Sequence, residues 1–475
     1  MKKILLSRKA CPALFRHCQL MVLSLALLLP SISGCATLPD VSPIIEGSPA
    51  SQGAPQILSS KGLLSPQKSQ AIMERLKRSA GPSDMLERHT AVVESVTESP
   101  LTKGNKITLL TDGQGTYAAM FKAIGQARNH VNLESYIFEG DETGRKFADL
   151  LLQKRAEGVR VHVIYDSMGS INTPDAFFQR LRDGGIEVVA FNPLNPLNSG
   201  ETWSLTHRDH RKILIVDGKT AIIGGVNISK VYSSLPGRRK QGKKSPIHWR
   251  DTDIRIEGPA VAELQKLFLD TWLKQKGTKL AGSGFFPAQK ETGTALVRVV
   301  GSTPGESNRI PFVVYVSAIA FADKSIHLTN SYFIPDDQIV AALTDAARRG
   351  VDVKVIVPGT TDSALALHAQ RYHYSELLKS GVRIYEHKTS LLHAKTAVID
   401  GVWSTVGSTN MDFLSMLTND EVNAVILNRE FALEMEQMFA KDLVQCREIR
   451  RQDWEKRSLV PKAKEWFVSW FIRWL

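Results

Sequence analysis

Cysteine is scarce in this chain of 475 residues: there are four, and three of them, Cys11, Cys18 and Cys35, lie near the N-terminus. The rest of the chain has Cys446 alone, which excludes an internal disulfide framework or a cysteine-rich metal site there. Long apolar runs are also rare. Leu20–Leu29 is the longest, which excludes a polytopic membrane protein. Acidic residues are outnumbered, 48 against 60 Lys and Arg, and the net charge of +12 favours anionic partners such as phosphate groups, nucleic acid or an acidic lipid surface.

Residues 1–35 have the composition of a signal peptide. Basic residues precede Leu20–Leu29, which is too short to span a bilayer as a helix. The segment ends in Ile32-Ser-Gly-Cys35, which resembles the lipobox of bacterial lipoproteins; the alternative is a plain secretory signal. The resemblance implies cleavage before Cys35, lipidation of its sulfur and, with Ala36 next, sorting to an outer membrane. We therefore expect an extracytoplasmic, membrane-anchored lipoprotein that faces the periplasm.

Residues 36–100 are expected to form a tether rich in proline and serine, with short helices at about 67–79 and 83–97. The body of the chain then contains an internal repeat, because residues 325–333 match 130–138 and residues 350–357 match 158–165. Strands alternate with amphipathic helices in both copies, which predicts an α/β fold. We expect two similar α/β sandwich domains, related by a pseudo-twofold axis, with one active site where they meet.

The domain boundaries follow from this repeat. We place the first domain at residues 101–282, the second at 290–446 and a basic, aromatic C-terminal tail at 447–475.

Each domain carries the same polar motif. The two copies are His210, Lys212, Asp217 and Asn227, and His393, Lys395, Asp400 and Asn410. Lys, Asp and Asn follow the His at identical spacing, and the apolar residues after each Lys predict a strand, on which residues i and i+2 share a face. The Asp-Gly pair that ends each strand predicts a hairpin turn, which brings the Asn back toward the His. Asp217 and Asp400 lie at this turn, and so a structural role is expected for them.

The paired motifs resemble those of the phospholipase D superfamily, His-x-Lys-x4-Asp, over about residues 100–450. The resemblance implies two phospholipase D-like domains and phosphodiester exchange, in which one His forms a phosphohistidine and the other transfers protons. It implies that His210 is the nucleophile and His393 the acid and base, although the near-symmetry of the copies leaves this open. Both motifs, with their Lys, Asp and Asn residues, form the expected catalytic set, and no metal or other cofactor is expected.

Two downstream carboxylates are expected to orient the histidines. A neutral imidazole that acts as a nucleophile needs an acceptor for its second ring nitrogen. Asp251 follows His210 by 41 residues and Glu421 follows His393 by 28, each at the start of a predicted strand. The resemblance implies that these carboxylates fulfil this role; the alternative is that they are solvated surface acids.

The substrate is expected to be an anionic membrane lipid. Residues 249–252, 254–264 and 417–423 resemble bacterial cardiolipin synthases, which implies transfer of a phosphatidyl group from one phosphatidylglycerol to another with release of glycerol. Trp466, Trp470 and Trp474 recur at helical spacing, which predicts either an interfacial membrane helix or a helix docked on the protein itself. The acceptor stays open between lipid, glycerol and water, and the oligomeric state is not predicted. The alternatives are a hydrolytic phospholipase D, a periplasmic phosphodiesterase or nuclease, and a non-catalytic lipid-binding lipoprotein.

Overall fold

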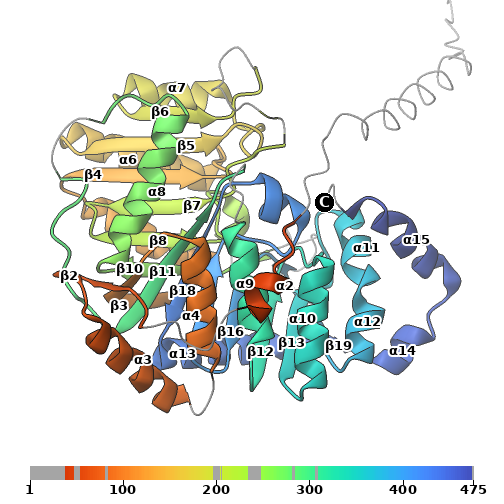
Figure 1. The fold of residues 1–475 in the computed structure, drawn as a ribbon. Coiled ribbons are helices and arrows are strands. Elements are labelled where there is room, and N and C mark those ends of the chain that lie inside the picture. The colour runs from red at the N-terminus through yellow and green to blue at the C-terminus, as the bar shows by residue number, and fades with distance from the viewer. Residues whose placement is uncertain are drawn as a thin grey trace, which may run out of the picture. The chain divides into compact units, whose positions relative to one another are not determined.

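The computed structural model describes residues 38–47, 54–80, 84–195, 204, 206–233, 248–280, 284–304 and 309–472. The expected signal segment, Cys35 and Trp474 lie outside the described residues, so cleavage and lipidation stay predictions. From Pro39 onward the chain forms one unit, which contains two lobes of similar topology (Figure 1).

The first lobe is built on a mixed sheet with the spatial order β6-β5-β4-β7-β8-β10-β3. These strands are β3 (Leu101–Leu110), β4 (His130–Ser135), β5 (Arg160–Asp166), β6 (Glu187–Phe191), β7 (Lys212–Val216), β8 (Thr220–Gly224) and β10 (Asp253–Glu257). Strands β4, β5 and β6 are parallel, as the alternation of strands and helices predicts, whereas the other pairs are antiparallel.

The second lobe repeats this order with β14-β13-β12-β16-β17-β18-β11. Its strands are β11 (Ala295–Ser302), β12 (Ser325–Asn330), β13 (Asp352–Pro358), β14 (Arg383–His387), β16 (Lys395–Ile399), β17 (Trp403–Gly407) and β18 (Glu421–Leu427). Every strand of the first sheet therefore has a counterpart in the second, and the predicted internal repeat of an α/β domain is confirmed.

Helices cover both sheets (Figure 1). Those of the first lobe are α5 (Gly113–Gly125), α6 (Glu142–Ala156), α7 (Asp175–Asp183) and α8 (Ala260–Lys274). Those of the second are α9 (Ile310–Ala320), α10 (Asp337–Arg348), α11 (Ala364–Tyr372), α12 (Tyr374–Lys379) and α13 (Arg429–Leu443). The sequence explains such helices locally: the Asp112 side chain caps the first turn of α5, and Tyr117, Met120 and Ile124 form its buried stripe.

The two sheets are continuous through β3 and β11. Ala295 and Val297 of β11 pair antiparallel with Asn105 and Thr102 of β3, while the other end of β3 pairs with β10. One hydrophobic core extends across this junction, because side chains such as Trp272 of α8 and strands of both lobes belong to the same buried cluster. The junction therefore fixes the two lobes relative to each other.

Each polar motif lies on the hairpin that the sequence predicts. Asp217 and Gly218 between β7 and β8, and Asp400 and Gly401 between β16 and β17, all adopt positive φ. This left-handed conformation is what Asp-Gly favours in a tight hairpin turn. The two carboxylates also accept hydrogen bonds from the backbone N–H groups of the neighbouring loop, at Arg128, Asn129 and His130 in the first lobe and at Asp323, Lys324 and Ser325 in the second.

The segment expected to be a tether is partly folded. Helix α2 (Ser42–Glu46) lies beside the second lobe, where the Val41 N–H donates to the Gln338 side chain, and β1 (Ile57–Ser59) pairs with β3. The short helices expected in this region are α3 (Pro66–Ala80) and α4 (Met85–Val96), of which α4 packs against α9. Apolar residues such as Val41 and Ile57 are buried, which explains why these stretches fold despite their proline and serine content.

The C-terminal tail is also folded. Strand β19 (Cys446–Ile449) pairs with β14, and helices α14 (Arg451–Glu455) and α15 (Leu459–Ser469) pack against α12 and α11 respectively. None of the helices in the described part of the chain combines the length and the apolar character that crossing a bilayer requires.

The Asp217 carboxylate predicts a stability effect. Replacing Asp217 by Ala leaves three backbone N–H groups without their charged acceptor, so we expect the free energy of unfolding to fall by about 2–4 kcal/mol. Asp217→Asn should lose less, because the amide oxygen still accepts. Urea unfolding followed by tryptophan fluorescence measures both changes, with Asp183→Ala at the exposed end of α7 as the control. Equal stability of Asp217→Ala and the native protein would contradict the structural role.

Candidate active site

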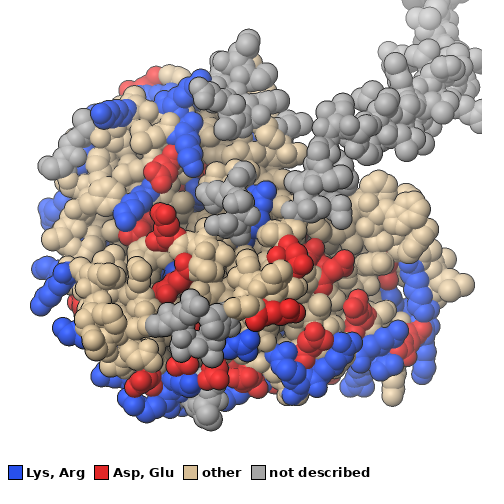
Figure 2. All heavy atoms as spheres, in the orientation of Figure 1, with Lys and Arg blue, Asp and Glu red and all other residues tan. Residues whose placement is uncertain are grey.

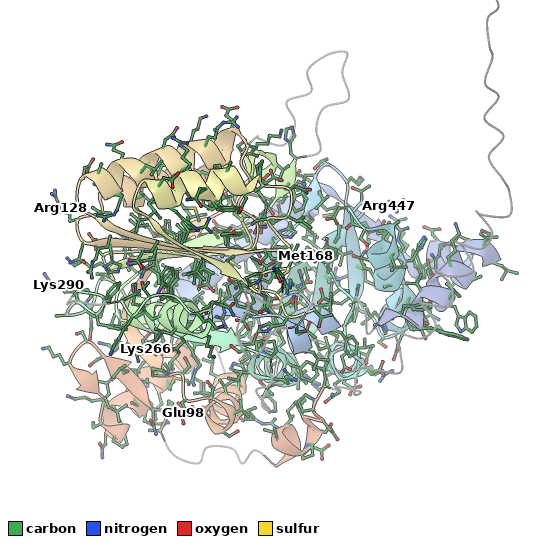
Figure 3. All side chains as sticks on the ribbon, turned by 90° about the horizontal axis from the view of Figure 1, so that it is seen from above. Glu98, Arg128, Met168, Lys266, Lys290 and Arg447 are labelled. Atoms are coloured by element: carbon green, nitrogen blue, oxygen red, sulfur yellow. The ribbon has the colours of Figure 1, made fainter. Side chains whose placement is uncertain are left out.

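A cleft of about 630 Å³ is lined by residues of both lobes. Met168, one of the lining residues, lies near the middle of the molecule, between the yellow ribbons of the first lobe and the blue ribbons of the second (Figure 3). Four of the sequence-predicted site residues line this cleft, namely His210, Asn227, His393 and Asn410. The two motifs, 183 residues apart at their histidines (393 − 210), thus meet at one cavity.

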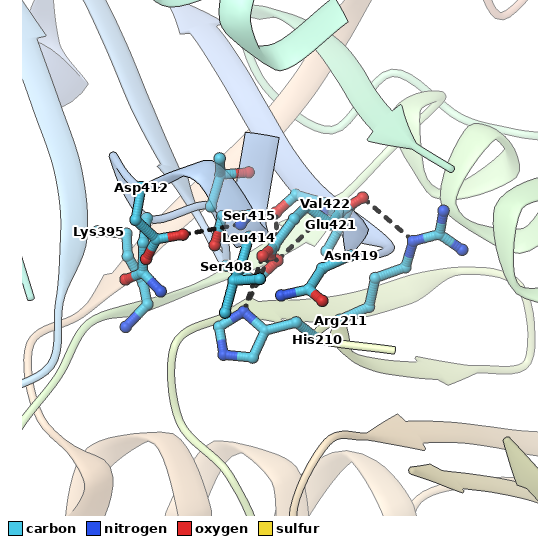
Figure 4. A network of polar contacts seen from close by, with 12 residues as sticks. His210, Arg211, Lys395, Ser408, Asp412, Leu414, Ser415, Asn419, Glu421 and Val422 are labelled. Atoms are coloured by element: carbon cyan, nitrogen blue, oxygen red, sulfur yellow. Dashed lines mark hydrogen bonds and ion pairs between the residues drawn. The ribbon is translucent and has the colours of Figure 1, made fainter. Parts of the chain in front are cut away.

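His210 is held by a carboxylate of the other lobe. Its Nδ1–H donates to Glu421 Oε1 at 2.9 Å and to Oε2 at 3.1 Å (Figure 4). Both side chains are buried. The bond to Nδ1 fixes the ring orientation and leaves Nε2 as the nitrogen available to a substrate.

His393 has the reciprocal arrangement. Its Nδ1–H donates to Oδ2 of Asp251, in the first lobe, at 2.7 Å. The Tyr232 hydroxyl lies 3.4 Å from the same nitrogen, and the Trp249 ring lies 4.9 Å from the imidazole, centroid to centroid. Each lobe therefore provides one histidine and the carboxylate that holds the histidine of the other.

Backbone hydrogen bonds also join each histidine to the opposite lobe. The His210 N–H donates to the Asp420 carbonyl at 2.9 Å, and the His393 N–H donates to the Arg250 carbonyl at 2.8 Å. Asp420 and Arg250 directly precede Glu421 and Asp251. Each histidine is thus joined twice to the opposite lobe, once by its backbone and once by its ring.

Two buried arginines hold the carboxylate segments. Arg211 Nε donates to the Glu421 carbonyl at 3.1 Å, and Arg250 Nη1 donates to the Asp251 carbonyl at 2.6 Å. Arg250 also forms a two-pronged ion pair with Asp442 of α13, in the second lobe. Such bidentate geometry is rigid, so it restrains the segment that carries Asp251.

The two sites differ in what faces the carboxylate. A Cβ at Gly225 would lie 2.2 Å from Asp251 Oδ1, so only glycine leaves room for this carboxylate. The matching residue of the second motif is Ser408, whose hydroxyl donates to Glu421 Oε2. Glu421 therefore accepts from a side-chain hydroxyl, whereas Asp251 Oδ1 accepts from the backbone N–H of Thr252 at 2.8 Å.

Burial favours the neutral form of both imidazoles. It lowers the pKa of His210 well below its ordinary value, and it lowers the pKa of His393 to about 4, with the Lys395 ammonium adding to the shift. Burial also raises the pKa of Glu421 to about 7. A neutral imidazole with a free Nε2 can attack an electrophilic phosphorus, whereas an imidazolium cannot.

The motif lysines lie beneath the histidines. Lys212 Nζ donates to the His210 carbonyl at 2.5 Å, Lys395 Nζ donates to the His393 carbonyl, and Lys395 also reaches the Ser331 hydroxyl at 2.7 Å. Burial lowers the pKa of Lys212 to about 7 and that of Lys395 to about 8. In the protonated form the two ammonium groups place positive charge beside both rings, which favours an anionic substrate.

The motif asparagines are held by neighbouring groups. Asn227 Oδ1 accepts from the Ile137 N–H, and its Nδ2 donates to the Tyr232 hydroxyl. Asn410 Oδ1 accepts from the Ser331 hydroxyl, which also binds Lys395. Both amides thus belong to hydrogen-bond networks that hold them in place at the cleft.

Not every residue of the motif reaches the cleft. Asp217 and Asp400 lie at the turns of their hairpins and bind backbone amides there, as their position in the sequence predicts. Tyr136 and Tyr332, at matching positions of the repeat, do line the cleft, and the Tyr136 ring lies 5.1 Å from that of His210.

Several residues of this site are missed by the sequence analysis. Arg211, Tyr232 and Ser408 contact or hold the histidine–carboxylate pairs, yet Arg211 and Ser408 lie between the motif residues and Tyr232 lies outside both motifs. A signal for Ser408 exists, because the aligned motifs differ there, with Gly225 in one copy and Ser408 in the other. No local pattern identifies Tyr232.

The arrangement defines a class of protein. Two oriented imidazoles at one cleft can serve one phosphorus as nucleophile and as acid and base, and two buried ammonium groups can balance the charge of the transferred group. These features are those of a phosphodiester-transferring enzyme.

Comparisons with known proteins agree with this class. The family described as "Cardiolipin synthase, PLD-like domain" matches residues 120–235 and 315–443. The cardiolipin synthase of Alkalihalophilus pseudofirmus is 33% identical over 396 residues, or 82% of this chain and 76% of that protein. The cardiolipin synthase of Listeria monocytogenes serotype 4b is 35% identical over 368 residues, or 77% of this chain and 74% of that protein.

A solved structure supports the fold. The phosphatidylserine synthase of Haemophilus influenzae superimposes with a TM-score of 0.59 at 14% sequence identity, over 80% of this chain and 96% of that one. The chain therefore belongs to the cardiolipin synthase, phospholipase D-like family. The predicted class, a phosphatidyltransferase of the phospholipase D type that acts on anionic phospholipids, is confirmed.

The predicted location is wrong. The sequence suggested an extracytoplasmic lipoprotein facing the periplasm, but the relatives are bacterial cardiolipin synthases, which are membrane-bound with a cytoplasmic active site. The prediction depended on residues 1–35 alone, where a short apolar run and the lipobox-like Cys35 are weak indicators of location. The match over 396 residues carries far more.

The buried lysines predict the pH dependence of activity. Lys212, with a pKa of about 7, and Lys395, with a pKa of about 8, lose their charge as the pH rises through this range. The protonated forms attract the anionic phospholipid, and kcat/KM reports ionisations of the free enzyme, so kcat/KM should fall as the pH rises above this range. Initial rates on vesicles of constant composition, with vesicle binding measured in parallel, test this. A level profile up to about pH 10, near the ordinary lysine pKa, would contradict it.

Proposed function

We propose that this protein is a cardiolipin synthase, which transfers the phosphatidyl group of one phosphatidylglycerol to a hydroxyl of a second and releases glycerol. The observation that carries the proposal is the reciprocal pair of imidazoles, each held at Nδ1 by a carboxylate of the opposite lobe and both lining one cleft. The similarity to cardiolipin synthases over about four fifths of the chain supports the choice of lipid.

The proposed first step is attack of His210 Nε2 on the phosphorus of phosphatidylglycerol. The new P–N bond replaces the P–O bond to the glycerol headgroup, and protonated His393 gives its Nε2 proton to the departing oxygen. Burial lowers the pKa of His393, but a bound phosphodiester brings a negative charge that favours the imidazolium. Asp251 accepts from Nδ1 in both states.

The proposed second step reverses the first. His393, now neutral, takes the proton from a hydroxyl of a second phosphatidylglycerol, whose oxygen attacks the phosphorus and displaces His210. The P–N bond breaks, cardiolipin leaves, and both histidines regain their starting protonation. Lys212, Lys395, Asn227 and Asn410 are proposed to stabilise the negative charge on the phosphoryl oxygens.

Product analysis tests this function. Full-length protein with vesicles of phosphatidylglycerol, labelled in the headgroup, should yield cardiolipin and labelled glycerol in equal amounts. Loss of the proposed nucleophile in His210→Ala should lower the rate at least about 1,000-fold, with native circular dichroism as the control for folding.

Other outcomes of this experiment would identify the alternative functions. Phosphatidic acid without cardiolipin would mean hydrolysis, turnover of an oligonucleotide without lipid turnover would mean a nuclease, and lipid binding without turnover would mean a binding protein. A full rate in His210→Ala would overturn the mechanism.

We also propose that α15 lies in the membrane interface. Trp466, Phe467, Trp470 and Phe471 are 55%, 58%, 66% and 44% exposed. The surface over α11 and α15, at the upper right of Figure 2, is largely free of charged side chains. Exposed aromatic side chains on an amphipathic helix favour the bilayer interface.

The other face of α15 is docked on the protein. Val468 of α15 and Ile472, three residues after its end, are buried in a cluster with Ala366 and Ala369 of α11 and with Tyr332. Ala366 and Tyr332 also line the cleft, so α15 backs directly onto one wall of the proposed active site. A helix in the interface at this position would place the cleft close to its lipid substrate.

Replacing Trp466 and Trp470 together by Ala should weaken binding to phosphatidylglycerol vesicles at least about tenfold, because two exposed aromatic surfaces no longer enter the interface. Vesicle sedimentation measures the change, and Val444→Ala, an exposed apolar residue between α13 and β19, is the matched control. Unchanged binding in the double variant would assign α15 a purely structural role.

A further inference from the structure

The two walls of the cleft carry opposite charge. Among the described residues that line it, the charged side chains other than the histidines are Arg208 on the first lobe and Asp362 and Asp412 on the second. At the surface of the cleft, Arg208 attracts a phosphodiester anion and the Asp362 carboxylate repels it, while the ammonium groups of Lys212 and Lys395 lie buried beside the histidines. The second wall therefore suits a neutral part of the substrate that donates hydrogen bonds.

Asp362 is placed to accept such hydrogen bonds. It lies in the loop between β13 and α11, where the Tyr332 hydroxyl donates to its Oδ1 at 2.6 Å and the Thr361 hydroxyl donates to the same oxygen at 2.9 Å. Both hydrogen bonds that the described residues make to this carboxylate use Oδ1, so Oδ2 remains for a ligand. Asp362 and Tyr332 line the cleft together with His393.

At the matching position of the first lobe the side chain is a serine instead of a carboxylate. Aligning residues 350–357 with 158–165 places Ser170 at the position of Asp362. The Ser170 hydroxyl accepts from the Phe138 N–H at 3.0 Å and donates to the Tyr136 carbonyl, so it serves the backbone of the lobe. Lobes that match strand for strand thus differ in the residue that faces the substrate on one side of the cleft.

We propose that Asp362, supported by Tyr332, binds the non-reacting hydroxyl groups of the glycerol headgroup on the His393 side of the phosphorus. This inference rests on the proposed function. The same subsite would receive the headgroup first as the leaving alcohol and then as the acceptor, because the two steps are the reverse of each other. In both steps the reacting hydroxyl exchanges its proton with His393, while the neighbouring hydroxyls donate to Asp362.

The proposal also gives the two histidines distinct roles. An in-line displacement places the alcohol on the side of the phosphorus opposite the nucleophile. An alcohol subsite on the second-lobe wall therefore favours His393 as the acid and base and His210 as the nucleophile, which the near-symmetric motifs leave open.

Competition between two acceptors tests the subsite. Deuterated glycerol and 1-propanol are supplied at equal concentration and compete for the same phosphohistidine, which gives labelled phosphatidylglycerol or phosphatidylpropanol. Any effect of a substitution on the reaction with the donor lipid cancels in the ratio of these two products. Native protein should favour glycerol. Asp362→Ala should lower the glycerol to propanol ratio about tenfold, since the site loses its charged acceptor for hydroxyls that propanol lacks.

Two further variants sharpen the result. Asp362→Asn keeps an acceptor oxygen and should lose less of the preference than Asp362→Ala, and it also serves if the alanine variant does not fold. Asp345→Ala replaces an exposed residue of α10 that lies outside the cleft, and it should leave the ratio unchanged.

The outcomes separate the two proposals. If native protein yields neither cardiolipin nor either alcohol product, the proposed function fails. If it yields cardiolipin but neither alcohol product, the subsite alone is overturned. If it yields both products without favouring glycerol, or if Asp362→Ala leaves the ratio unchanged, the subsite alone is overturned. Ethanolamine serves as a third acceptor and tests whether the carboxylate prefers an ammonium group. If native protein prefers ethanolamine and Asp362→Ala removes this preference, Asp362 binds an ammonium group and the glycerol assignment is overturned.

Discussion

Each imidazole of the cleft depends on a carboxylate from the opposite lobe. Burying an imidazole or a carboxylate costs free energy unless a partner compensates for the lost water, and here the partner of His210 is Glu421 and that of His393 is Asp251. Separating the lobes would break the hydrogen bond that joins each histidine to its carboxylate. The cross-lobe pairs therefore link assembly of the fold to formation of the site.

The surroundings of these pairs reinforce the link. Arg211 and Arg250 donate to the carbonyl groups of Glu421 and Asp251, and the β3–β11 junction makes the two sheets one surface with a shared core. A site built on such restrained elements holds its groups in place before the substrate arrives. This preorganisation is what transition-state stabilisation requires, because the protein then needs little rearrangement during the reaction.

The sequence predicts what is local. The strand after each motif histidine, the Asp-Gly turn and the shared face of His210 and Lys212 follow from residue spacing, and the internal repeat predicts two like domains. Which carboxylate faces which histidine does not follow, because that depends on how two sheets dock across more than 100 residues of chain. Arg211 escapes prediction for the same reason, because it donates to the backbone carbonyls of Glu421 and Ser302 in the other lobe.

Local composition is a weaker guide near the two ends of the described chain. The proline- and serine-rich N-terminal region predicted a tether, yet apolar residues such as Val41 and Ile57 fold parts of it onto the lobes. The tryptophan spacing near the C-terminus allowed either an interfacial helix or a docked one. Helix α15 has one face docked and aromatic side chains exposed on another, so the two alternatives are compatible.

Covalent linkage of the two lobes has an evolutionary consequence. A homodimer of a chain half this length could form the same reciprocal pairs, but every substitution would then alter both sides of the phosphorus at once. Within one chain each copy can change independently, as Gly225 against Ser408 and Asp251 against Glu421 already illustrate. Fusion of the two copies thus allows a symmetric scaffold to specialise. In the proposed reaction the departing and the entering alcohol occupy the same side of the phosphorus, so the two sides need different residues.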